Sequence, residues 1–142
     1  MLAIFVKYIQ DHEDWLMGRI LHYAEQRAYT KYTSTLREAW RLSISGLSQS
    51  FVELIEAKGE DIELGPEEDY RGDPATQFGV TAAQRHRERG VSLDMFLGLM
   101  KYYRQSYQDL IDDSNFSAPE KQRFSNLVKR FFDRIEIAFC TT

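Results

Sequence analysis

The chain has 142 residues, of which 43% are hydrophobic and 28% are charged, and its net charge at pH 7 is −4. This length and composition indicate a single domain, residues 1–142, that buries about two thirds of the surface of its unfolded chain. The negative charge gives no electrostatic support to nucleic-acid binding, and a single cysteine excludes an internal disulfide or a thiolate zinc site.

The first apolar run, MLAIFV, ends at Lys7. It is too short for the core of a secretory signal and far too short to span a bilayer, so we expect no membrane partner. The lone cysteine, Cys140, is typical of a compartment where thiols stay reduced. We therefore expect a cytoplasmic location.

Apolar residues recur at spacings of three and four along most of the chain, and this periodicity predicts an all-α fold of five or six helices. Residues 2–27 make up the first helical stretch. Asp11 and Asp14 could cap a second helix within it, so the pattern leaves open whether the stretch holds one helix or two.

The next helix is predicted to begin at a capping box formed by Thr35 and Glu38, and to end at Lys58 and Gly59. Small residues thin out one side of it: Ser43, Ser45, Gly46 and Ser48. A side without bulk favours a close crossing with another helix, and a polar pocket is the alternative.

Residues 58–74 form the one long loop, with the acidic sequence GEDIELGPEEDYRGDP. Loops of this length inside a compact domain are usually functional or disordered. We interpret this one as a solvated linker, and the pattern leaves open whether it is ordered.

Asp73 followed by Pro74 predicts the start of a further helix, because the order is a capping residue and then proline at the first helical position. Gly90 is expected to end that helix in the left-handed conformation. Ser92 is placed to cap the helix that follows.

The last helix, residues 118–142, opens on a capping box formed by Ser117 and Glu120. No stop signal precedes Phe139, so we expect an output helix that continues into a signalling linker. The last two helices carry more apolar surface than a monomer of this size needs to bury, which predicts a homodimer. Four residues are candidates for the dimer contact: Phe131, Phe132, Ile135 and Phe139.

The usual catalytic motifs are missing. The sequence has no glycine-rich phosphate loop, no H-E-x-x-H and no G-x-S-x-G. His12 and Glu13 match two letters of the phosphoacceptor box of histidine kinases, but the Arg and Pro that should follow are absent. We therefore expect no enzymatic activity from this chain.

His86 lies on a helix face of small residues, which are Gly79, Ala82, Ala83 and Gly90. Such a face lets another helix or a flat ligand approach the backbone, and an imidazole there could coordinate haem iron. The favoured interpretation is a helix contact in which His86 is hydrogen-bonded, beside a closed or narrow apolar pocket. The arginines around His86 are interpreted as a solvated face.

The other candidates for a ligand pocket are Trp40 and Arg41, next to the small-residue run, and Tyr103 and Tyr107 on a later helix. Aromatic residues at helical spacing pack into the core more often than they line a pocket, so core packing is the competing interpretation.

Two stretches carry a resemblance to a known family. They are HEDWLMGRILHYAEQRAYTKYTSTLREAWRLSISGLS and RHRERGVSLDMFLGLMKYYRQSYQDLI. Together they resemble the N-terminal sensor domain of RsbR-type stressosome co-antagonists, which also occurs at the front of bacterial sensor histidine kinases. The ending FFDRIEIAFC looks like the segment that leads into a coiled linker and a PAS domain in such kinases.

The resemblance implies a globin-like fold, a homodimer without haem, and a role as a sensory input and dimerisation domain in a two-component system. A weaker resemblance, to globin-coupled sensors, rests on the spacing of His86, Gly90, Val91 and Phe96. It implies the alternative function, a haem-based gas or redox sensor with His86 as proximal ligand. The sequence departs from those sensors at two residues. Arg89 stands where the sensors usually have an aliphatic residue, and Met95 stands where they often have an aromatic one.

Overall fold

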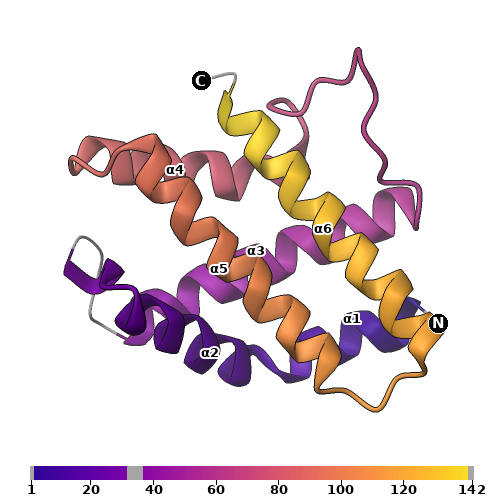
Figure 1. Ribbon diagram of the computed structural model, residues 1–142. Coiled ribbons are helices and arrows are strands. Elements are labelled where there is room, and N and C mark those ends of the chain that lie inside the picture. The colour runs from indigo at the N-terminus through magenta and orange to yellow at the C-terminus, as the bar shows by residue number, and fades with distance from the viewer. Residues whose placement is uncertain (1, 32–36, 141–142) are drawn as a thin grey trace.

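The computed structural model describes residues 2–31 and 37–140, and within them it has six α-helices, two 3₁₀ turns and no strand (Figure 1). The helices are α1 (Leu2–Asp11), α2 (Glu13–Gln26), α3 (Arg37–Lys58), α4 (Gln77–Glu88), α5 (Leu93–Asp112) and α6 (Ala118–Cys140). The 3₁₀ turns are Tyr29–Lys31 and Pro74–Thr76. The prediction of an all-α fold with five or six helices is confirmed, and the globin-like arrangement stays a prediction.

The first helical stretch is two helices. The chain leaves helical geometry at His12, whose φ is −116° and ψ is 24°, and neither Asp11 nor Asp14 is the capping residue of α2. The His12 ring stays on α1, with Nδ1 2.6 Å from the backbone oxygen of Tyr8. The predicted capping box of α3 includes Thr35, which lies outside the described residues.

Three of the four later capping predictions are confirmed. The fourth is confirmed only in position: Ser92 is the N-cap residue of α5, but its side chain makes no capping hydrogen bond. The Asp73 carboxylate accepts a hydrogen bond of 3.0 Å from the amide of Ala75, ahead of Pro74. Gly90 follows α4 with a φ of 87°, a left-handed conformation that favours glycine. Ser117 and Glu120 exchange two hydrogen bonds at the start of α6.

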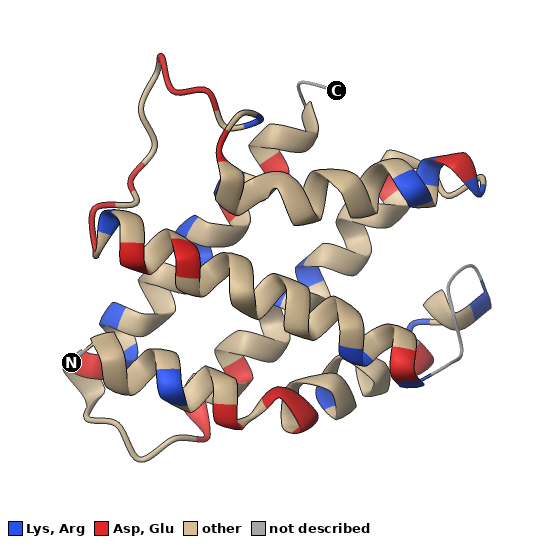
Figure 2. Cartoon of the chain, turned by 180° about the vertical axis from the view of Figure 1, so that it is seen from behind, with Lys and Arg blue, Asp and Glu red and all other residues tan. Residues whose placement is uncertain are grey.

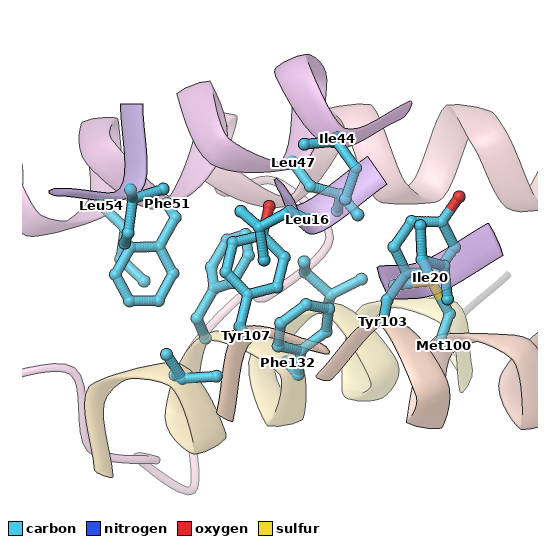
Figure 3. Close-up of a cluster of buried hydrophobic side chains, with 14 of the residues drawn as sticks. Leu16, Ile20, Ile44, Leu47, Phe51, Leu54, Met100, Tyr103, Tyr107 and Phe132 are labelled. Atoms are coloured by element: carbon cyan, nitrogen blue, oxygen red, sulfur yellow. The ribbon is translucent and has the colours of Figure 1, made fainter. Parts of the chain in front are cut away.

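The core lies where α2 packs against α3 and α5, and α5 packs against α6. Rings on α5 extend toward α3, with Tyr103 and Tyr107 among aliphatic side chains of α2 and α3 (Figure 3). Burial raises the pKa of Tyr107, so its hydroxyl stays protonated and shares a 2.7 Å hydrogen bond with the hydroxyl of Ser48. One of the small residues on α3 therefore serves a buried polar contact.

Helix α6 contributes its whole apolar face to this core. The four residues proposed for a dimer contact are at most 1% exposed: Phe131, Phe132, Ile135 and Phe139. That proposal for the contact residues is wrong, because α6 is covered by the rest of the same chain. The homodimer itself stays a prediction. The most exposed large apolar residues lie on four separate segments, and they are Ile4, Leu42, Leu64 and Leu93.

The acidic loop between α3 and the Pro74–Thr76 turn is mostly exposed, as expected of a solvated linker, but it is anchored to the protein at particular residues. Two of its apolar residues, Ile62 and Tyr70, are 1% and 8% exposed. The Tyr70 hydroxyl donates a 2.9 Å hydrogen bond to the backbone oxygen of Gly65 within the loop. Acidic residues are spread along it (Figure 2).

An arginine on α6 holds this loop. Arg134 is only 1% exposed, and its guanidinium donates to the carboxylates of Glu68 and Asp73 and to the backbone oxygen of Glu63. The guanidinium carbon also lies 5.1 Å from the centre of the Tyr70 ring. The hydrogen bond from Arg134 lowers the pKa of Glu68 below its usual range. Two of the loop acids, Glu68 and Asp73, are thus counterions of a buried cation.

None of the helices within residues 2–31 and 37–140 is both long enough and apolar enough to cross a bilayer.

Replacing Arg134 should destabilise the fold far more than replacing its neighbour Arg130. In Arg134→Met, Glu68 and Asp73 lose their buried cation, and we expect the free energy of unfolding to fall by about 3 kcal/mol. Arg130 pairs with Glu63 at 2.7 Å, with 39% and 69% of the side chains exposed. Arg130→Met should therefore lose less than about 1 kcal/mol. Urea denaturation measures both, and equal losses would contradict the role given to Arg134.

Candidate functional site

A pocket of about 480 Å³ lies between α3, α4 and α5. This volume is within the range of small-molecule sites in proteins. Its lining residues come from three helices: Ala39, Trp40, Leu42, Ser43 and Leu47 of α3; Gln77, Phe78, Gly79, Thr81, Ala82, Arg85 and His86 of α4, with Arg89 after it; and Phe96, Leu99, Met100 and Tyr103 of α5.

The inner wall of the pocket is apolar and fixed by the core. Phe96, Leu99 and Met100 are 3% to 4% exposed. Tyr103 lies with its ring centre 6.1 Å from that of Trp40 and nearly parallel to it. Burial raises the pKa of Tyr103, so the pocket holds a neutral hydroxyl there. A ligand with an apolar body matches this wall.

His86 is held by its own helix. Its Nδ1 lies 2.7 Å from the backbone oxygen of Ala82. A carbonyl oxygen only accepts hydrogen bonds, so Nδ1 carries the proton, and in the neutral ring Nε2 keeps its lone pair. The ring also lies 4.9 Å from that of Phe96. The structure thus agrees with the prediction of a hydrogen-bonded His86.

The predicted pocket residues are only partly brought together. Trp40, His86 and Tyr103 line the same pocket. Arg41 does not line it, because its guanidinium is turned to the surface, where it pairs with Asp14 at 2.5 Å. Tyr107 lies one turn further along α5, in the core, where its hydroxyl is bonded to α3. The assignments of Arg41 and Tyr107 to the pocket are therefore wrong.

The pocket is wider than expected, because the small residues make close helix contacts at its edges and do not close its interior. Gly46 of α3 lies against the ring of Phe78, which gives the predicted close crossing of α3 and α4. On the other side of α4, a Cβ on Gly79 would lie 2.7 Å from Cγ2 of Ile135. These contacts bring α4 close to α3 and α6 without filling the space beside His86. The expectation of a closed or narrow pocket is wrong.

Two arginines at the mouth of the pocket were missed as site residues. Arg85 and Arg89 are exposed, as predicted for a solvated face, but both line the pocket. Basic residues, interrupted by an acidic one, lie at this end of α4 (Figure 2). Their spacing of four residues places them on the same side of the helix, and that spacing was the signal in the sequence.

No protein-family model, curated protein or solved structure matches the chain. Across residues 2–31 and 37–140 there is also no group of three or more His, Cys, Asp or Glu side chains that could hold a metal ion. The geometry of the pocket is therefore the basis for a functional proposal.

The close crossing at Gly46 predicts opposite effects for two Gly→Ala changes. A methyl group at Gly46 would meet the Phe78 ring, so Gly46→Ala should lower the free energy of unfolding by about 1–3 kcal/mol. Gly18, inside α2, has nothing within 4 Å of such a methyl group. Gly18→Ala should raise the free energy of unfolding by up to about 1 kcal/mol, because alanine has a higher helix propensity than glycine. Thermal or urea unfolding tests this, and a stabilising Gly46→Ala would contradict the crossing.

Proposed function

We propose that this chain is the cytoplasmic sensory input domain of a bacterial signal-transduction protein, in which a small molecule in the α3–α4–α5 pocket changes the packing of α6. Helix α6 would pass that change to a downstream PAS or kinase domain of the same protein. The observation that carries the proposal is the position of Phe96. It lines the pocket, and its ring centre lies 5.3 Å from that of Phe139 on α6.

A second contact supports the same route. Gly79 lines the pocket on α4, and its backbone lies against Ile135 and Phe139 of α6. Closely packed helices have little free volume, so a ligand that displaces α4 or Phe96 also displaces the side chains of α6. Two walls of the pocket thus contact the last two turns of α6 on the side that faces away from the pocket.

The proposal assigns no catalysis to this chain, in keeping with its lack of a phosphate-binding loop or a complete phosphoacceptor box. It includes a homodimer, as the resemblance to RsbR-type sensor domains implies. The contact between the two copies would be formed outside the buried face of α6. The domain would act on its effector through a change in conformation.

Filling the pocket should change the dynamics of the end of α6. Ala82 and Phe96 line the same pocket, and in Ala82→Phe the added ring would fill part of that pocket. We expect hydrogen–deuterium exchange of the amides of residues 133–140 to speed up severalfold, because the contact with Phe139 is disturbed. Ala57→Phe, at an exposed position of α3 outside the pocket, is the control. The same exchange in both variants would refute the proposed route.

Haem sensing is the second candidate function, and the state of His86 favours it. Metal-bound histidines usually donate their other ring N–H to a carbonyl or carboxylate, as His86 Nδ1 does to Ala82. The pocket residues therefore fit haem in this one respect, with Nε2 of His86 as the nitrogen that would hold the iron. Haem would supply the site for a diatomic gas or a redox change.

The two candidates are separated by an absorption spectrum of the protein with and without added haemin. Under the preferred proposal, no Soret band depends on His86. A band that appears in the parent protein and is lost in His86→Ala would assign the pocket to haem instead. His12→Ala is the matched control, since His12 has the same contact with its own helix but does not line the pocket.

A further inference from the structure

We infer that the pocket takes an apolar organic carboxylate, with its apolar body against α5 and its carboxylate between Arg85 and Arg89. This inference rests on the proposed function, because it names the class of ligand for the same pocket. It is carried by the charges that line the pocket.

The charge around the pocket is of one sign. Arg85 and Arg89 are both lining residues, and no Asp or Glu is among those lining residues. The absence of acidic residues from the lining around two arginines is unusual in a chain with 22 acidic residues and a net charge of −4. An anion that enters the pocket meets two cations and no opposing carboxylate.

The two arginines are also free to bind a ligand. Within the described residues, neither has a carboxylate within ion-pair distance, whereas many other arginines do. Arg87, on the same helix, also lacks such a partner, but it lies on another side of α4 and does not line this pocket. Position relative to the pocket is what distinguishes Arg85 and Arg89 from Arg87.

A single negative charge fits better than a phosphate. Arginine binds both carboxylate and phosphate through paired hydrogen bonds. Arg85 and Arg89, however, lie at the C-terminal end of α4, where the helix dipole places a partial negative charge. This end of a helix disfavours a dianion. The remaining lining is apolar or neutral, with rings from Trp40, Phe96 and Tyr103 that suit a flat hydrophobic body.

The test compares two compounds of nearly the same shape, 2-naphthoate and 2-naphthamide, by isothermal titration calorimetry with the 142-residue chain. We expect the carboxylate to bind at least about tenfold more tightly, as hydrogen bonds to a charged group imply. The double variant R85Q/R89Q should lose that preference. R87Q should keep it, because it removes the same charge from the same helix outside the pocket.

Other results would overturn the inference in distinguishable ways. Equal binding of both compounds, unchanged in R85Q/R89Q, rejects the carboxylate and leaves an uncharged ligand for the proposed sensor. Tighter binding of 2-naphthyl phosphate than of 2-naphthoate assigns the arginines to a phosphate. If no compound binds at millimolar concentration, the inference fails, and the exchange of residues 133–140 in Ala82→Phe still decides the proposed function independently.

Discussion

The close contact between α4 and α6 at Gly79 sets the position of nearly everything that bears on function. Because Gly79 has no side chain, Ile135 and Phe139 can lie directly against the backbone of α4. This fixes α4 beside α6 while its other side faces α3 and α5, which leaves the pocket between them. Phe96 completes the arrangement by contacting both His86 and Phe139. A larger residue at this crossing would move α4 and change the pocket and the end of α6 together.

Helix α6 makes different contacts along its length. Its beginning belongs to an aromatic cluster, where Phe124 stacks on Phe5 of α1 with ring centres 4.2 Å apart. Its end faces α4 and α5, and between the two Arg134 binds the acidic loop. A buried cation with two carboxylates requires its partners in place, so the loop is tied to α6. Most of α6 is therefore held by the aromatic cluster and the acidic loop, and the turns around Phe139 lie next to the pocket.

Periodicity and capping chemistry predicted the helices well, because both are local. Gly90 and the Ser117–Glu120 box mark ends that the structure confirms. What failed required knowledge of distant partners. A sequence shows that Phe131 is on an apolar face, but not that the same chain covers it. In the same way, the anchor of the acidic loop is not visible until Arg134, some 60–70 positions later, is seen beside Glu68. Arg85 and Arg89 were visible as a basic run, and only the fold shows that they border a pocket.

The central claim is that the pocket and the end of α6 are coupled through Phe96 and Phe139. A double-mutant cycle with Phe96→Leu and Phe139→Leu, read from the free energies of unfolding, tests it most directly. The account predicts an interaction energy of at least about 0.5 kcal/mol, since the rings are in contact. The cycle of Phe96→Leu with Phe124→Leu, at the other end of α6, should be additive within about 0.3–0.5 kcal/mol. Additive effects for Phe96 and Phe139 would contradict the account.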